Sequence, residues 1–429
     1  MEDVDSGQRT QVRRAAVASV IGTTIEWYDF FLYGTTAAVV FGPAFFPSFS
    51  PTAGTLASFA TFFVGFAARP VGAAIFGHFG DRIGRKATLI MTLLLMGIGT
   101  FLIGLAPTFR TIGLWAPVVL TILRLIQGIA VGGEWGGSVL LAMEWGSRRS
   151  RGLMGSWAQM GVPIGLFLST VVFSASLSLT GENFNNWGWR IPFLLSIVLV
   201  AVGLFIRLRI VETPAFSRIL EERSTARLPV LDVIKNNPRE IILSAVIRMA
   251  EQAPFYIFTS YVLAYGTNQL GISRQFLVNS VALAALISCV TVPLYGHLSD
   301  RIGRKRMYMI GAVGTLIYAF IFFGLLNTAI LALVLIAIVV SLQPHDAMYG
   351  PQAAFIAESF STKLRYSGAS LGYQLASVIA GGPAPLIAGS LLAVTGSGYA
   401  IAGYIAFNAV CTIIATAMMK DRTGVDIEV

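Results

Sequence analysis

Three arginines lie inside long apolar stretches of the sequence: Arg69, Arg124 and Arg248. Charged residues within membrane segments face the interior of a helix bundle or a watery cavity, because lipid does not solvate them. A guanidinium binds a carboxylate through two parallel hydrogen bonds, so the three arginines predict a site for an anionic substrate. For each arginine the alternative is a structural ion pair with an acid on a neighbouring segment.

Two carboxylates, Glu26 and Asp29, stand one helical turn apart in the first apolar stretch. Glu26 is expected near the middle of the membrane, roughly 16 Å from the helix end. Both acids are predicted to carry the coupling proton or to contact the substrate. Equally, either acid could neutralise Arg69 in a structural pair.

Two further acids are predicted to bind the coupling proton. Glu134 lies about 15 Å along a helix from Arg124, which leaves it without an arginine partner on its own helix. Asp346 follows Pro344 and His345 in a stretch that we expect to be a broken helix lining a cavity. His345 is either a titratable group in that cavity or a packed, hydrogen-bonded one.

Uncharged polar side chains accompany these charged groups on the expected helices. Gln127 shares a helix face with Arg124, and Glu251 follows Arg248 by one turn, where the two could neutralise each other. Tyrosines and amides orient small polar solutes through hydrogen bonds. The predicted substrate contacts besides the arginines are Gln127, Tyr33, Tyr256, Tyr373 and Gln374.

A ten-residue sequence occurs twice, at 77–86 and 296–305, each time between two apolar stretches. The copies are 219 positions apart in a chain of 429 residues, which indicates an internally duplicated membrane protein. Their charged residues are expected at the membrane surface, where they would stabilise one state of a gate. The predicted gating residues are Asp81, Arg85, Asp300 and Arg304 in the two copies, with Glu144 and Glu358 at the ends of the fourth and tenth spans, which are expected to pair with the arginines of the copies.

The elements that must position these residues are transmembrane helices. The chain is 55% hydrophobic and 12% charged, against about 25% charged in soluble domains. Backbone groups find no water in lipid, so we expect an all-α membrane protein with 12 transmembrane helices in two six-helix bundles. The expected spans are 16–41, 54–78, 87–106, 115–143, 153–178, 190–210, 240–266, 275–297, 306–326, 329–357, 367–394 and 397–419.

Most of the 30 basic residues lie in alternate connecting segments, whereas the opposite segments hold only Arg110, Arg190 and Arg274. By the positive-inside rule, both termini and both repeated loops are expected to be cytoplasmic. The expected domains are an N-terminal tail at 1–15, a bundle at 16–210, a cytoplasmic linker at 211–239, a second bundle at 240–419 and a C-terminal tail at 420–429.

Other classes of function are not favoured. The net charge of +9 follows from the topology, so no nucleic-acid partner is expected. The two cysteines form no framework, and the absence of metal, cofactor and nucleophile motifs argues against an enzyme. No removable signal peptide is expected in the polar first fifteen residues. The expected partners are a small organic acid, protons and the lipid bilayer, and the protein is expected to be monomeric.

The motif set resembles the major facilitator superfamily. The paired loops resemble its signature loop, and Arg124-x-x-Gln127-Gly128 resembles its motif in the fourth span. Similarity to the metabolite:proton symporter family lies at 26–30, 69–72, 132–137 and 187–193. Similarity to the shikimate-carrying members of that family lies at 59–62, 345–346, 365–369 and 372–378. This family takes up α-ketoglutarate, citrate, shikimate, proline and betaine.

The resemblance implies a proton-coupled symporter of a bacterial inner membrane that imports a small carboxylated metabolite by alternating access, with its site between the two bundles. One alternative is a symporter of a zwitterionic osmolyte such as proline or betaine. Such carriers end in a long coiled coil, whereas about ten residues follow the last expected span here. A second alternative is a proton-driven drug exporter, which the three intramembrane arginines disfavour.

Overall fold

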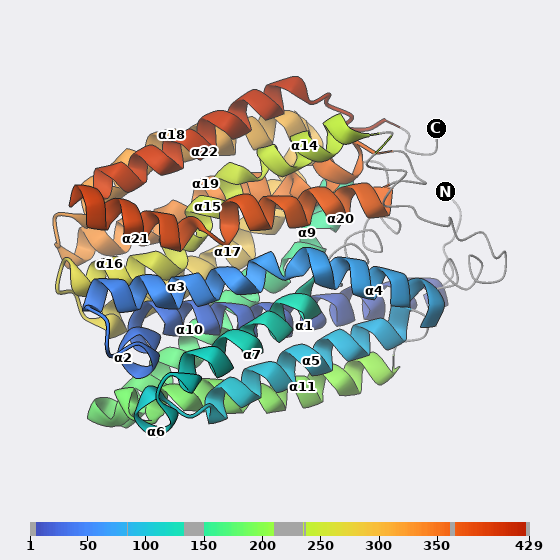
Figure 1. Cartoon of the computed structure of the whole chain (residues 1–429). Coiled ribbons are helices and arrows are strands. Elements are labelled where there is room, and N and C mark those ends of the chain that lie inside the picture. Colours follow the sequence, from blue (N-terminus) through green and yellow to red (C-terminus); the bar gives the residue numbers. More distant parts are fainter. Residues whose placement is uncertain are drawn as a thin grey trace.

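The computed structural model describes residues 6–83, 85–132, 150–209, 235, 237–360 and 365–425, and the regular structure in these ranges is helical. The helices join end to end into twelve rods that run in one general direction (Figure 1). Nine helices in these ranges are long and apolar enough to cross a membrane, and shorter apolar helices lie at Ile90–Leu105 and Trp115–Val131. The predicted all-α architecture is confirmed.

The first six rods form one half of the molecule. Within it, α1 packs on α10 and α11, and α7 packs on α3, α4 and α5. The first helix begins at Ser6, within the stretch expected to be a tail. The rods are α1 (Ser6–Thr36) with η1 (Ala37–Phe41) and α2 (Gly42–Phe45); α3 (Pro51–Ala67) with α4 (Arg69–Ile83); α5 (Arg85–Leu105); α7 (Trp115–Val131); α9 (Arg151–Gln159) with α10 (Gly161–Thr180); and α11 (Ile191–Arg209). Short helices α6 (Phe109–Ile112), η2 (Gly181–Asn185) and η3 (Gly188–Arg190) join them.

The other six rods form the second half. Here α19 packs on α17 and α18, and α22 packs on α14, α15 and α18. The rods are α14 (Pro238–Ile247) with α15 (Met249–Tyr256), η4 (Ile257–Tyr261) and α16 (Val262–Asn268); α17 (Arg274–Ile302); α18 (Arg304–Leu326); α19 (Leu331–Ala357); α20 (Arg365–Ala376) with η5 (Ser377–Gly381) and α21 (Ala384–Thr395); and α22 (Gly398–Met418).

One expectation about the second half is wrong, because α19 is unbroken through Pro344 and Pro351. Each proline removes one backbone hydrogen bond, but its fixed φ near −65° is still helical. Packing against α17 and α18 on both sides holds this rod together. Asp346 therefore sits on a continuous helix, and its place in the site depends on side-chain contacts.

The seventh rod is interrupted instead, at Arg248 between α14 and α15. The hydroxyl of Thr412 on α22 is inserted there: it accepts a hydrogen bond from the Ala250 N–H at 3.0 Å and donates one to the Val246 carbonyl at 3.0 Å. A side chain inserted into the helical ladder is a recognised cause of a kink. The kink therefore lies at Arg248, the third predicted arginine.

Glycines let α7 approach the second rod closely. A Cβ added to Gly128 would lie 2.1 Å from the Gly65 carbonyl oxygen, and one added to Gly132 would lie 2.0 Å from the Arg69 carbonyl oxygen. Small residues allow such backbone contact between membrane helices. This packing brings Arg69 and Arg124 into one interior region.

The outer surface of the bundle is apolar, as a lipid-facing surface should be. Val290, Ile317 and Phe407 are each at least half exposed, at 66%, 58% and 60%. By contrast, the three predicted arginines are at most 1% exposed. The charges are therefore turned away from the surface that lipid would contact, as membrane burial requires.

Candidate substrate and proton site

Arg69 and Arg124 meet at an aromatic surface in the first half. The guanidinium of Arg69 lies 4.4 Å from the ring centre of Phe30 and 4.3 Å from that of Phe66. The guanidinium of Arg124 lies 4.1 Å from the ring centre of Phe30 and 4.2 Å from that of Tyr33. Cation–π contacts stabilise buried guanidinium groups without consuming their hydrogen-bond donors.

Several of those donors have no partner. The Nε and Nη2 atoms of Arg69 and of Arg124 are buried and make no hydrogen bond. Arg124 donates from Nη1 to Gln127 Oε1 at 3.2 Å, and Gln127 Nε2 donates to the Thr100 hydroxyl at 2.6 Å. The expected Arg124 and Gln127 face is thus present. A buried donor without an acceptor is unfavourable, which makes these atoms candidates for ligand binding.

The two acids of α1 differ in their surroundings. Glu26 is 7% exposed and lies within electrostatic reach of Arg69. Asp29 is 1% exposed, and the neighbour of its carboxylate is the hydroxyl of Thr100 and not an arginine. Asp29 is therefore not the ion-pair partner of Arg69, and that alternative remains only for Glu26.

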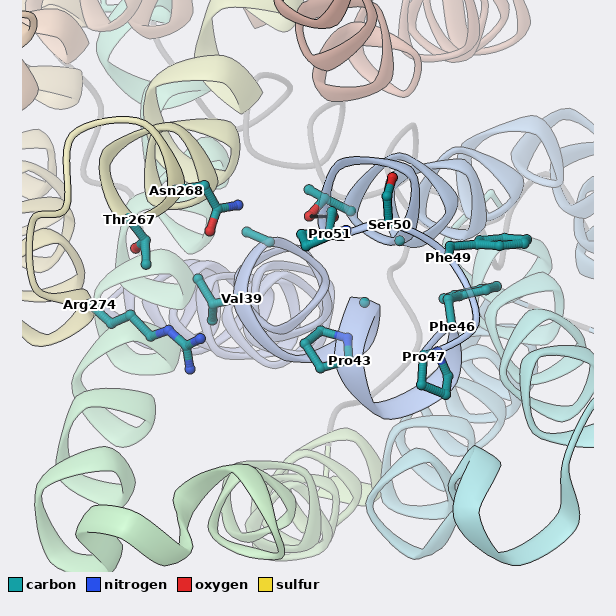
Figure 2. A pocket seen from close by; sticks show the side chains of 14 residues that line it. Val39, Pro43, Phe46, Pro47, Phe49, Ser50, Pro51, Thr267, Asn268 and Arg274 are labelled. Atoms are coloured by element: carbon teal, nitrogen blue, oxygen red, sulfur yellow. Dashed lines mark hydrogen bonds between the residues drawn. The ribbon is translucent and has the colours of Figure 1, made fainter.

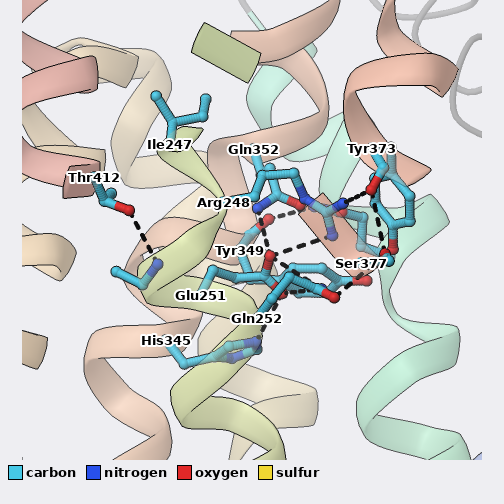
Figure 3. A network of polar contacts seen from close by, with 12 residues as sticks. Ile247, Arg248, Glu251, Gln252, His345, Tyr349, Gln352, Tyr373, Ser377 and Thr412 are labelled. Atoms are coloured by element: carbon cyan, nitrogen blue, oxygen red, sulfur yellow. Dashed lines mark hydrogen bonds and ion pairs between the residues drawn. The ribbon is translucent and has the colours of Figure 1, made fainter. Parts of the chain in front are cut away.

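The third arginine lies in the second half. Arg248 donates from Nη1 to the carbonyl oxygen of Tyr373 at 2.6 Å, and its guanidinium lies 3.4 Å from the ring centre of Tyr373. Its Nη2 atom is 3.2 Å from Glu251 Oε2, so the pair that the one-turn spacing allowed is formed (Figure 3). Arg69 is within electrostatic reach of Arg248 as well as of Arg124. The three arginines therefore belong to one interior region between the halves.

Glu251 is held by more partners than the sequence indicated. Gln252 Nε2 donates to its Oε1 at 2.9 Å, and Gln352 Nε2 donates to its Oε2 at 3.0 Å. His345 Nε2 lies 3.4 Å from Oε1 (Figure 3). Gln352 follows His345 by seven residues, which is two helical turns, so this spacing was a signal for a shared polar face. Gln352 is not among the predicted site residues.

Asp346 is bound from two sides. His345 Nδ1 lies 2.9 Å from its Oδ1, and the Thr291 hydroxyl on α17 donates to its Oδ2 at 2.5 Å. Asp346 is fully buried. It thus belongs to the polar cluster around Glu251, and His345 is the link between the two acids.

The other predicted contacts surround this region. The hydroxyls of Tyr33 and Thr61 are 2.6 Å apart, and the ring of Tyr256 lies 5.1 Å from that of Phe66 across the interface between the halves. Gln374 Nε2 donates to the Gly132 carbonyl of the other half at 3.3 Å. These residues lie around the arginines, and Tyr256 and Gln374 contact the first half from the second.

The helices α4 and α17 end, and α5 and α18 begin, at one end of the molecule, which we call the loop end. Contacts between the two halves are formed there. Arg304 and Glu358 form an ion pair there, as expected, and Arg304 Nη2 lies 3.3 Å from Asp300 Oδ1. Glu358 also lies 3.8 Å from Arg151 of α9, in the first half. The side chain of Gln159, not among the predicted residues, donates to the Tyr349 carbonyl across the same interface.

The halves also touch at the opposite end. The Ser174 hydroxyl donates to Asn279 Oδ1 at 2.5 Å, and Arg274 Nη1 donates to Asn185 Oδ1 at 2.9 Å. A hollow of about 290 Å³ opens beside Arg274, between the segment 42–55 and the end of α16 (Figure 2). It shares no lining residue with the arginine region. The described residues therefore join the two halves at both ends of the molecule.

Some predicted residues lie beyond what the structure describes. Glu134 and Glu144 fall in 133–149, outside the described residues. Asp81 lies on α4 and Arg85 begins α5, but the positions of their side chains are not described. Most of the expected linker, at 211–234, is likewise outside the described part of the chain. The predictions for these residues remain untested.

Comparison with known proteins identifies the architecture. The family model of the Major Facilitator Superfamily matches residues 19–385. The shikimate transporter of Escherichia coli (strain K12) is 42% identical over 417 residues, covering 96% of this chain and 95% of the relative. The inner membrane metabolite transport protein YhjE of the same organism is 42% identical over 416 residues, covering 95% of this chain and 94% of the relative.

More distant relatives and solved structures agree. The proline/betaine transporter of E. coli (strain K12) is 32% identical and covers 98% of this chain and 85% of the relative. The proton:xylose symporter XylE, solved with 6-bromo-6-deoxy-D-glucose, superimposes with a TM-score of 0.74 at 18% identity, with 98% of each chain covered. The resemblance found in the sequence is confirmed: this chain is a multi-pass inner-membrane transporter, not an enzyme, and it belongs to the major facilitator superfamily.

Proposed function

We propose that this transporter is a proton-coupled symporter that imports a small carboxylated metabolite, shikimate or a related organic acid. The observation that carries the proposal is the set of three buried arginines, Arg69, Arg124 and Arg248, in one interior region. Arg69 and Arg124 each have Nε and Nη2 atoms without a hydrogen-bond partner, and so has the Nε atom of Arg248, whose Nη2 pairs with Glu251. A carboxylate placed among them would supply the missing acceptors and offset the buried positive charge.

Contacts between the halves at both ends of the molecule support alternating access as the mechanism. The loop end and the opposite end are both held by contacts between the halves. If each set of contacts opens in turn, the arginine region is exposed first to one side of the membrane and then to the other. We further propose that the loop end, with both termini, faces the cytoplasm, as the distribution of basic residues predicts.

Proton coupling is proposed from the buried acids. Asp29 is 1% exposed with Thr100 as its polar neighbour, and a buried carboxylate that no cation neutralises is unfavourable when it is charged. Proton binding at such a group is therefore linked to the charge of the substrate beside it. The 42% identity to the shikimate transporter supports an organic acid as the substrate.

A zwitterionic osmolyte is the second candidate, because the proline/betaine transporter is 32% identical to this chain. A quaternary ammonium group would need open aromatic faces. The faces of Phe30, Tyr33, Phe66 and Tyr373 are instead covered by guanidinium groups. This arrangement favours an anion over a zwitterion, and it also disfavours a drug exporter with a large apolar pocket.

The test has two stages. Purified protein is first screened by thermal shift against shikimate, quinate, α-ketoglutarate, citrate, benzoate, proline and betaine. We expect a carboxylic acid to raise the unfolding temperature more than betaine does. Proteoliposomes with an inward proton gradient should then accumulate that acid. Stabilisation by betaine alone, or gradient-driven efflux of the acid, would contradict the proposal.

A further inference from the structure

We propose that His345 is the residue that binds the transported proton in the second half, clamped between Glu251 and Asp346. This inference rests on the proposed function and deepens it, because it names a proton site and its link to the substrate. It differs from the prediction that the carboxylates themselves carry the proton. The reason lies in how the imidazole ring is held.

Each nitrogen of the His345 ring faces a different carboxylate. Nε2 lies 3.4 Å from Glu251 Oε1 on α15, and Nδ1 lies 2.9 Å from Asp346 Oδ1 on α19. A neutral imidazole has one N–H donor and one acceptor nitrogen. The lone pair of that acceptor nitrogen would face a lone pair of a carboxylate oxygen, which is repulsive. Only the protonated ring donates at both positions. The geometry therefore matches the imidazolium form.

The charge balance of the cluster leads to the same conclusion. Arg248 contributes one positive charge, and Glu251 and Asp346 contribute two negative charges; all three side chains are at most 2% exposed. One proton on His345 makes the cluster neutral. Without it, a net negative charge would be buried inside the bundle, which is unfavourable.

In the described part of the chain, the groups that face His345 are acids, aromatic rings and uncharged polar side chains, and Arg248 lies behind Glu251. On α15 it faces Glu251, with Arg248 behind, and the ring of Phe255 lies 4.6 Å away. On its own helix it stacks on Tyr349 at 5.1 Å. The helix α17 contributes the Thr291 hydroxyl, which donates to Asp346, and Cys289, which lies near the same acid. The helix α18 contributes the Tyr308 hydroxyl, and Gln352 donates to both this hydroxyl and Glu251. Tyr373 of α20 reaches the cluster through Arg248.

Glu251 connects the proton to the substrate, because it is shared by His345 and Arg248. When an anionic substrate binds Arg248, that arginine pairs less with Glu251. The proton on His345 then balances most of the negative charge of Glu251. When the substrate leaves, Arg248 returns to Glu251 and the His345 proton is held less strongly. Substrate and proton thus raise each other's affinity, as thermodynamic linkage requires. The proton adds from water to a ring nitrogen and leaves from it to water on the other side.

The composition of the chain allows a direct test, because it contains only three histidines: His78, His297 and His345. The double variant His78→Gln/His297→Gln leaves His345 as the single histidine, and we expect it to transport as the wild type does. Nitrogen-15 NMR of its labelled imidazole reads the protonation of the ring directly. The probe is shikimate, or the panel acid with the largest thermal shift if shikimate gives none.

We expect both ring nitrogens to be protonated with the acid bound at pH 7.5, and the pH at which the ring loses its proton to fall when the acid is removed. A neutral ring in the acid-bound protein, or a titration that the acid does not move, would overturn the inference. This measurement uses an intact His345, so it does not depend on whether variants at that position fold.

Transport assays give a second readout. We expect His345→Gln and Glu251→Gln to lower gradient-driven accumulation of labelled acid at least tenfold, and to lower exchange of the acid at equal pH by a smaller factor. His297→Gln, an exposed histidine at the loop end, is the matched control and should behave as the wild type. Undiminished accumulation by His345→Gln would overturn this inference alone. A wild-type protein that exchanges the acid but ignores the gradient would overturn proton coupling itself, and this inference with it.

Discussion

Asp300, near the end of α17 in the second half, accepts a hydrogen bond of 2.8 Å from the backbone N–H of Gly152 in the first half. The N–H of Leu153 donates to its other oxygen at 3.0 Å. Both amides belong to the first turn of α9, so the carboxylate also meets the positive end of the helix dipole. One acid from the repeated sequence thus joins the two halves at the loop end.

Asp300→Asn should weaken this connection, because the amide keeps the shape but loses the charge. The loss is about 1 kcal/mol, which corresponds to a roughly fivefold rise in the population opened at the loop end. Ser156 is buried against Gly296 in the same interface. Alkylation of Ser156→Cys, in a Cys289→Ser/Cys411→Ser background, should therefore become faster. Asp421→Asn, an exposed acid at the same end, is the control. Equal rates with and without Asp300→Asn would contradict the prediction.

Arg124→Lys should weaken binding of the organic acid at least tenfold, or about 1.4 kcal/mol. Lysine keeps the charge but not the planar fork, and it contacts the rings of Phe30 and Tyr33 less well. Isothermal titration measures the affinity, with Arg110→Lys on the short helix α6 as the control. The alanine variants of Arg69, Arg124 and Arg248 extend the test. If all three bind the acid normally, the anion site has been assigned wrongly.

Gly128→Ala should destabilise the protein by about 1–3 kcal/mol, because the new Cβ would lie 2.1 Å from the Gly65 carbonyl oxygen. Neither backbone can move far without separating α7 from α3. Gly403→Ala on α22 is a matched control, since a Cβ there meets nothing within 4 Å. Thermal unfolding in detergent should show a lower midpoint for the first variant only. Equal midpoints would indicate that α7 can shift freely.

Glu358→Gln should destabilise the loop end by about 3–5 kcal/mol, because it leaves the fully buried Arg304 without its main carboxylate partner. The double variant Arg304→Met/Glu358→Gln removes the unpaired charge and should recover part of the loss. The unfolding midpoints of the three proteins test this order. A double variant less stable than Glu358→Gln would show that a group other than Glu358 balances the charge of Arg304.

Much of the site could be found in the sequence because lipid restricts where charges can stand. An arginine or acid within an apolar stretch is unfavourable unless it faces the protein interior. This rule alone selected Arg69, Arg124 and Arg248, all of which are buried, and Asp346, predicted through an expected break at Pro344, is buried as well. The expected broken helix at Pro344 was wrong for a reason outside the local sequence. The helix α19 is continuous and packs on α17 and α18, while a threonine from α22 is inserted between α14 and α15.

The sequence by itself determined the number of rods, the duplication into two halves and the set of charges that must avoid lipid. These properties depend on hydropathy and on repeats, which are local or periodic. Only the tertiary structure decided which charges meet. Asp300 and Gly152 are 148 positions apart, and Gln352 and Glu251 are 101 apart. No helical period relates residues on different rods, so the clamp on His345 exists only once α15, α17 and α19 have packed together.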